Sequence, residues 1–182
     1  MTIATSSHDG VASSLDSPRP IHVALKRKRQ DSFNLLRVVR NLLESGHNPA
    51  EVDGNGQTAL HVCSTVGAPL EVLRLFVDRV DPVVLDKPDF SSLTPLHCLL
   101  IQDGVVDPAC LECLVAAGAS LTSPSETRGT PLDCLARRSN DVAKLFDCLL
   151  DVSLDVLRQN EWSLLRIAFA DGSVVFMKVI MI

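Results

Sequence analysis

The sequence predicts an all-α solenoid of about five helix-turn-helix units joined by short β-hairpin loops. Three observations lead to this prediction: a tetrapeptide recurs at a fixed interval, apolar residues between its copies fall at helical spacing, and polar stretches of equal length precede two of the copies. Repetition at a period of roughly 33 residues is typical of stacked helical units, each too small to bury its apolar face alone. The chain has 182 residues and is 46% hydrophobic, which suffices for one continuous core.

The tetrapeptide copies set the period and the boundaries. Thr58-Ala59-Leu60-His61, Thr94-Pro95-Leu96-His97 and Thr130-Pro131-Leu132-Asp133 begin 94 − 58 = 36 and 130 − 94 = 36 residues apart. Weaker copies begin at Arg19, 58 − 19 = 39 residues before the first, and at Ser163, 163 − 130 = 33 residues after the last. We therefore expect one repeat domain over residues 19–182, with units near 19–57, 58–93, 94–129, 130–162 and, in part, 163–182.

Each strong copy predicts the start of a short first helix. A Thr side chain can accept a hydrogen bond from a free N–H of the first turn, and proline at the next position lacks only an N–H that the helix leaves unused. Asp133 follows Thr130 by three residues, which is the spacing of a capping box. A break such as Val66-Gly67-Ala68-Pro69 then separates the first helix from the second.

The second helices are predicted from apolar stripes and from the glycines that end them. The stripes comprise Leu35, Leu36, Val39, Leu42 and Leu43 in one helix and Leu73, Phe76 and Val77 in another. Gly46 and Gly118 stand where a left-handed residue commonly ends a helix. From these glycines to Thr58 and Thr130 are 58 − 46 = 12 and 130 − 118 = 12 residues, and we expect both polar stretches to form hairpin loops.

Helix, break, helix and polar hairpin, with Thr-Pro-Leu-His opening each unit, resemble the ankyrin repeat. The match is clearest over Leu42–Gly46, Asp53–His61 and Ala116–Leu121, and the repeat spans residues 19–182. The second unit departs from the family pattern with Ser92 where the family has glycine. The resemblance implies non-catalytic recognition of a protein partner, as an adaptor, a scaffold or an inhibitor.

The resemblance also implies where a partner binds. In ankyrin proteins the hairpin tips and one side of the first helices form a concave strip that is the usual binding surface. The matching hairpin positions here are Asp53, Asn55, Gln57, Asp86, Asp89, Phe90, Glu126 and Arg128, and the matching first-helix positions are Thr65, Val66, Ile101, Gln102, Arg137 and Arg138, with Lys26 and Arg27. Phe90 is either an aromatic anchor for the partner or a side chain that packs on the neighbouring tip.

The sequence contains no motif for catalysis, so we predict neither an enzyme nor a cofactor. His22, His61 and His97 share one repeat position and therefore spread along the solenoid, whereas the ligands of one metal all lie about 2 Å from it. The resemblance implies that these histidines bond backbone between units. Cys110-x-x-Cys113 leaves a second hypothesis open, a thiol- or metal-dependent regulator, because residues three apart share one helix face.

The net charge of −5 argues against a protein that wraps nucleic acid. Acidic tips beside basic floor residues instead favour a protein partner. The basic run Lys26-Arg27-Lys28-Arg29 has two open interpretations: a nuclear import signal or binding patch, or the solvated surface of a terminal unit.

The two ends of the chain carry their own expectations. Residues 1–18 are rich in Ser and Thr and are expected to be disordered. Residues 173–182 are apolar at 8 of 10 positions, which predicts a covered face, self-association or a fragment of a longer array. A ubiquitin-ligase substrate adaptor is an alternative if the chain is truncated. Neither a membrane span nor a secretory signal is predicted, which favours the cytoplasm, the nucleus or both.

Overall fold

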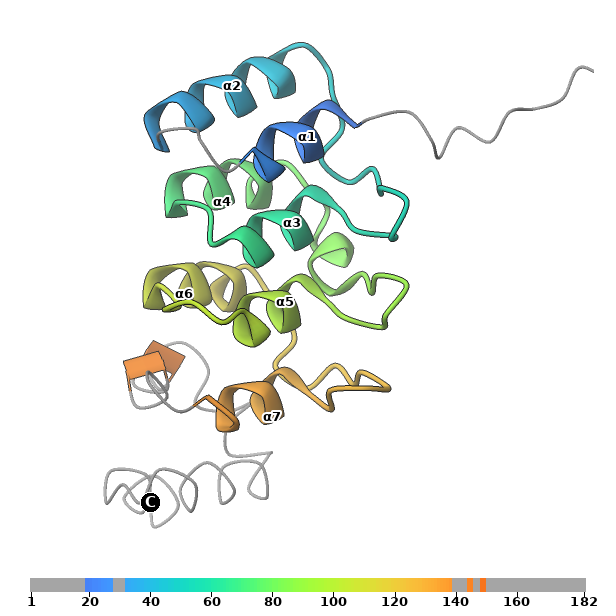
Figure 1. Ribbon diagram of the computed structural model, residues 1–182, viewed down its shortest axis with the longest axis vertical. Helices are drawn as coiled ribbons and strands as arrows, with labels where there is room; N and C mark the ends of the chain where they lie inside the picture. Colours follow the sequence, from blue (N-terminus) through green and yellow to red (C-terminus); the bar gives the residue numbers. More distant parts are fainter. Residues whose placement is uncertain (1–18, 28–31, 139–143, 146–147, 150–182) are drawn as a thin grey trace, which may run out of the picture.

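The computed structural model describes residues 19–27, 32–138, 144–145 and 148–149. Within these residues, seven α-helices and one 3₁₀ helix stack in layers, with hairpin loops along one side and no strand (Figure 1). This confirms the predicted all-α helix-turn-helix solenoid. Residues 1–18, for which disorder was expected, and the whole of the expected fifth unit, with its apolar segment 173–182, lie outside the described residues.

The helices form two rows. The first row lies beside the hairpins and contains α1 (Pro20–Lys26), α3 (Ala59–Val66), α5 (Pro95–Ile101) and α7 (Pro131–Ala136). The second row contains α2 (Ser32–Glu44), α4 (Leu70–Val77) and α6 (Pro108–Ala116). The 3₁₀ helix η1 (Pro82–Asp86) lies in the loop between α4 and α5. Each first helix therefore begins at a hairpin and ends at the break that leads to the second row.

The tetrapeptides open the first helices as predicted. Thr130 Oγ1 accepts from the N–H of Asp133 at 3.2 Å, and Asp133 Oδ2 accepts from the N–H of Thr130 at 3.0 Å. In α5 a histidine takes the place of the acid, because the N–H of Thr94 donates to His97 Nδ1 at 3.2 Å. These reciprocal bonds satisfy N–H groups that a helix start otherwise leaves without a partner.

The same histidines join each unit to the next. The Nε2 atoms of His22, His61 and His97 lie 2.7, 3.0 and 3.0 Å from the carbonyl oxygens of Gln57, Leu93 and Gly129, one unit further along. Since the Nδ1 atoms of His61 and His97 accept from backbone N–H groups, their Nε2 atoms carry the proton and donate. Burial lowers the pKa of all three histidines, which favours this neutral form.

Stacking gives the described units one shared core. Leu60, Leu96 and Leu132, the leucines of the three strong tetrapeptides, are each 0% exposed. In the second row Val72 and Phe76 are equally buried. Helix α3 contacts both α1 and α5, and α5 contacts α7, so every inner unit buries apolar surface on two sides. This continuous core positions the hairpins and the first-helix ends beside one another.

Glycines end the helices and shape the tips, with one exception. Gly46 and Gly118 have φ of +87° and +104°, as expected for residues that stop a helix. At the first hairpin tip Gly56 has φ of +75°, and Ser92 takes the equivalent place in the second tip with φ of +60°. The departure noted in the sequence therefore puts a serine in the left-handed region, where a side chain is unfavourable.

Candidate protein-interaction surface

An aspartate closes each of the first two hairpins. Asp53 Oδ1 accepts from the N–H groups of Asn55 and Gln57 at 2.9 and 3.1 Å. Asp89 Oδ1 accepts from two N–H groups of its own hairpin at 2.8 and 3.0 Å. The aspartates stand 89 − 53 = 36 residues apart, so the repeat period was the signal in the sequence that could have marked both as structural.

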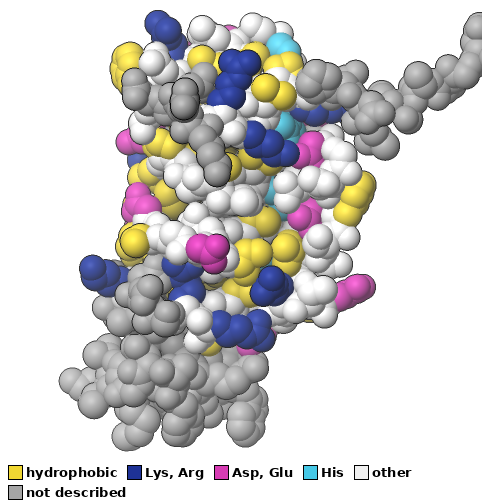
Figure 2. All heavy atoms as spheres, viewed as in Figure 1, with side chains coloured by type: hydrophobic (Ala, Val, Ile, Leu, Met, Phe, Trp, Pro, Cys, Tyr) yellow, Lys and Arg dark blue, Asp and Glu magenta, His cyan; other side chains and the backbone are white. Residues whose placement is uncertain are grey.

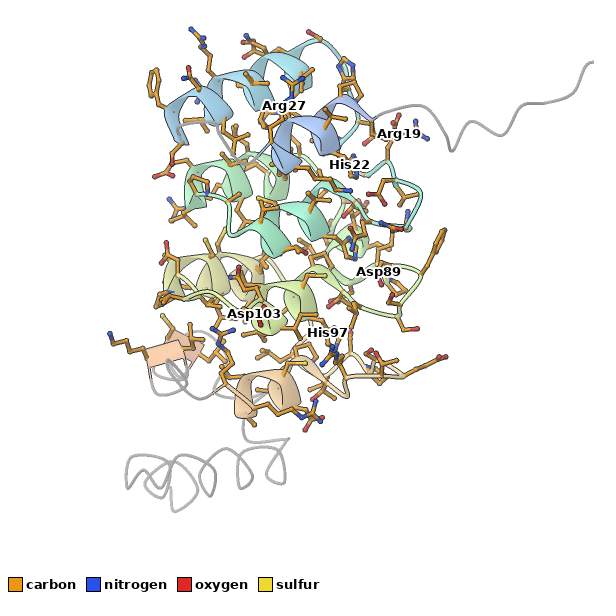
Figure 3. All side chains as sticks on the ribbon, viewed as in Figure 1. Arg19, His22, Arg27, Asp89, His97 and Asp103 are labelled. Carbon is orange, nitrogen blue, oxygen red and sulfur yellow. The ribbon has the colours of Figure 1, made fainter. Side chains whose placement is uncertain are left out.

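Asp89 does not lie free on the strip, which corrects the expectation for this residue. It is only 7% exposed, and its Oδ2 also accepts from Gln57 Nε2 of the neighbouring hairpin at 3.2 Å. Figure 3 shows Asp89 on the hairpin side of the stack. A partner that used this carboxylate would have to break the hairpin, so Asp89 holds the surface without forming its outer face.

Asp86 also serves the stack. It is half-buried at the end of η1, and its Oδ1 accepts from the N–H of Ser120 in the loop of the next unit at 2.8 Å. The bond joins two loops that are 34 residues apart in the sequence. The expected strip position of Asp86 is therefore corrected in the same sense as that of Asp89.

Asp53 links its hairpin to α1. Its Oδ2 pairs with Lys26 Nζ at 2.8 Å, and its side chain is 12% exposed. Burial opposes ionisation of this carboxyl, but the Lys26 bond and two backbone N–H groups outweigh burial and lower its pKa. Arg27 is exposed, whereas Lys28 and Arg29 of the basic run lie outside the described residues.

Phe90 combines both interpretations that the sequence left open. Its N–H donates to the carbonyl of Asn55 at 3.0 Å, and its ring lies over Gly56, where a Cβ would come within 2.6 Å of Phe90 Cδ1. Its side chain is nevertheless 74% exposed. The ring is thus held against the neighbouring tip and still presents most of its surface to solvent. Asn55 and, on the third tip, Glu126 are also exposed.

The ends of the first helices enclose two hollows. One hollow has a volume of about 630 Å³, lies at the ends of α1 and α3, and is lined in part by Lys26, Arg27, Thr65 and Val66. The other has a volume of about 280 Å³, lies at the ends of α5 and α7, and is lined by Leu100, Ile101, Gln102, Asp103, Arg128, Cys134, Arg137 and Arg138. The structure thus brings nine of the expected strip residues together, in two groups separated along the stack.

The second hollow is the more basic of the two. Arg138 is half-buried and donates to the carbonyls of Leu100, Gln102 and Gly104, while Arg137 is exposed and donates to the carbonyl of Arg128 at 2.6 Å. Dark-blue side chains gather over the α5–α7 end of the face in Figure 2. Sequence reasoning found these arginines by repeat position but could not show that Arg138 ties α7 to the end of α5.

The thiol hypothesis finds no support in this geometry. Cys110 is 4% exposed, and burial raises its pKa to about 11. Burial also raises the pKa of the half-buried Cys113. A reactive or metal-binding cysteine needs a lowered pKa, so both shifts have the wrong sign. Among the residues that the structure describes, no group of three metal-ligating side chains occurs, and no helix is long and apolar enough to span a membrane.

No model of a known protein family matches the chain. Among curated proteins, NF-kappa-B inhibitor delta of Mus musculus is 32% identical over 103 residues, which cover 47% of this chain and 31% of that protein. The NF-kappa-B p105 subunit of Gallus gallus is 25% identical over 156 residues, or 84% of this chain and 15% of that subunit. The p105 subunit of Rattus norvegicus is 26% identical over 110 residues, or 60% and 10%.

These relatives are ankyrin-repeat-containing regulatory proteins, and the chain spans 31% or less of their length. At this low identity the similarity indicates ankyrin repeats, in agreement with the helix pairs and hairpins of the structure. The comparison supports a role in protein interaction.

Proposed function

We propose that this chain is a non-catalytic protein-interaction module, without a cofactor, that binds a protein partner through the strip of hairpin tips and first-helix ends. The observation that carries the proposal is the gathering of strip side chains around two hollows. Phe90 stands beside them as an exposed ring on a tip that hydrogen bonds hold in place. Exposed aromatic and arginine side chains on a rigid support are typical of binding hot spots.

The partner that we propose is an NF-kappa-B protein, with the chain acting as an inhibitor. One relative is named as an NF-kappa-B inhibitor and two others as NF-kappa-B subunits, and the p105 similarity of 25% extends over 84% of this chain. These names favour an inhibitor over a general adaptor or scaffold. The cytoplasm, the nucleus or both are then where the chain acts.

Phe90 provides the sharpest test of this proposal. Binding of purified NF-kappa-B dimer to the immobilised chain would be measured by biolayer interferometry, for the parent and for Phe90→Ala. The expected result is saturable binding by the parent and a loss of affinity of roughly 30-fold in the variant, which corresponds to a hot-spot side chain.

Phe33→Ala is the matched control. Phe33 is 78% exposed and lies on α2, in the second row, whereas Phe90 is 74% exposed and lies on a hairpin tip. The control should bind as the parent does. Absence of binding by the parent would contradict the NF-kappa-B assignment, and an equal loss in both variants would contradict the strip as the binding surface.

A further inference from the structure

The hollow at the ends of α5 and α7 carries more positive charge than its surroundings. Its lining includes three arginines and a single acid, Asp103. Figure 3 shows Asp103 at the end of α5 opposite to His97, on the side away from the hairpins. The lining therefore has a net charge of 3 − 1 = +2, although the protein as a whole carries −5.

Arg138 forms a fixed part of the hollow. Its Nη1 donates to the carbonyls of Leu100 at 2.8 Å and Gln102 at 3.0 Å, and its Nη2 donates to the carbonyl of Gly104 at 2.7 Å. These bonds satisfy carbonyl groups at the end of α5 and hold the guanidinium in one place. The positive charge is therefore present before any ligand arrives.

Arg137 and Arg128 supply the donors that a ligand can use. A guanidinium has five N–H donors, and Arg137 spends one of them on the carbonyl of Arg128. Among the residues that the structure describes, neither side chain belongs to a recorded ion pair. Two exposed arginines that line one small space repel each other, and an anion between them would relieve that repulsion.

We propose that this hollow binds an acidic segment of the protein partner, whose carboxylates pair with Arg128 and Arg137. Guanidinium groups match carboxylates through two parallel hydrogen bonds, and a volume of about 280 Å³ suits one or two acidic side chains. Leu100, Ile101 and Cys134 provide apolar lining for their aliphatic stems. This inference rests on the proposed function, because it specifies which chemistry of the partner one part of the strip recognises.

The test uses the whole chain and a fluorescein-labelled peptide of alternating Glu and Gly residues. Fluorescence anisotropy would measure binding to the parent, to Arg128→Gln/Arg137→Gln and to Arg37→Gln/Arg40→Gln. Arg37 and Arg40 are exposed on α2, so the control removes the same charge from the second row. We expect salt-sensitive binding by the parent and the control, and binding at least about ten-fold weaker in the first variant.

Other results would overturn the inference. Equal binding by the two double variants would show that overall charge, and not the hollow, attracts the peptide. Equal binding of a matched Gln-Gly peptide would remove the role of the carboxylates, and absence of binding by the parent would contradict the site. Thermal unfolding of each variant would show whether the fold is retained, and lysine at both positions should restore binding in part because it keeps the charge.

The inference and the proposed function can fail separately. If Phe90→Ala weakens NF-kappa-B binding while the Glu-Gly peptide ignores the hollow, the interaction module stands and the acidic-segment site is wrong. If the peptide binds at the hollow but NF-kappa-B does not bind the chain, the site stands with a different partner, and the NF-kappa-B assignment is wrong.

Discussion

The first two hairpins and the third are built by different chemistry. An aspartate closes each of the first two, and these tips are tied together by the bond from the N–H of Phe90 to Asn55 and by the bond from Gln57 to Asp89. In the third hairpin Ser125 takes the equivalent place and accepts from the N–H of Thr127 at 3.4 Å, a long bond. Among the described residues, no corresponding bond joins the second and third tips. Identical spacing thus supports a fixed pair of tips and a less restrained third tip.

This difference also separates two kinds of binding surface. The first pair of tips holds Phe90 in place, which favours a preformed aromatic contact. The third tip ends in Arg128 beside the hollow of arginines, which favours recognition of charge. Preformed contacts bind with a smaller loss of conformational entropy than side chains that must be ordered on binding.

The largest expected effect concerns the aspartate that ties the first pair of tips. Asp89→Ala should lower the free energy of unfolding by about 2–3 kcal/mol, because it leaves several buried donors without an acceptor. Ser125→Ala should cost less than about 1 kcal/mol, because only one long bond is lost. Urea unfolding of both variants measures the difference. Equal losses would contradict the contrast between the hairpins, and Asp89→Asn, which keeps one acceptor oxygen, should fall between the parent and Asp89→Ala.

A smaller effect is expected from pH, through the histidines that join the units. Burial lowers the pKa of His22, His61 and His97, so below pH 6.5 the unfolded chain binds protons that the folded chain does not. The free energy of unfolding should be nearly constant above about pH 7 with respect to these groups. It should fall as the pH drops from about 6.5 towards their folded pKa values, by about 1.4 kcal/mol for each unit of pKa difference.

Urea unfolding at a series of pH values tests this expectation. His61→Gln should lower stability at neutral pH and should reduce the slope below pH 6.5, because one of the three groups no longer titrates. Asp133 replaces histidine in the next tetrapeptide, so the slope belongs to the earlier unit junctions. A slope that His61→Gln leaves unchanged would show that other groups cause the pH dependence.

The smallest expected effect concerns the backbone of the second tip. Ser92→Gly should raise the free energy of unfolding by about 0.5–1 kcal/mol, because glycine adopts φ of +60° without the steric cost of a side chain. Ser91→Gly is the matched control and should be neutral or destabilising, since the positive φ belongs to Ser92. Thermal or urea unfolding measures both. A destabilising Ser92→Gly would show that the serine side chain compensates for its strained backbone.

Much of the fold could be predicted from local sequence. Thr58, Thr94 and Thr130 announced the first helices because capping chemistry acts within a single turn. Gly46 and Gly118 announced helix ends because few other residues adopt a positive φ readily. The strip was predicted less well: Phe90, Arg128 and Arg137 are exposed there, but Asp86 and Asp89 hold other loops. Burial of a polar side chain depends on residues about one repeat away, which no local pattern describes.

The sequence by itself determined the period, the helix starts and stops, and the one-per-unit placement of His22, His61 and His97, because these follow from local chemistry repeated at 36-residue intervals. Only the tertiary structure decided which polar side chains remain available to a partner. Asp89 and Arg138 bond with groups 32 and 34 to 38 residues away, whereas Arg128 and Phe90 present their side chains to solvent. Stacking brings distant groups within hydrogen-bond distance, and a side chain that finds such a partner is no longer free to recognise another protein.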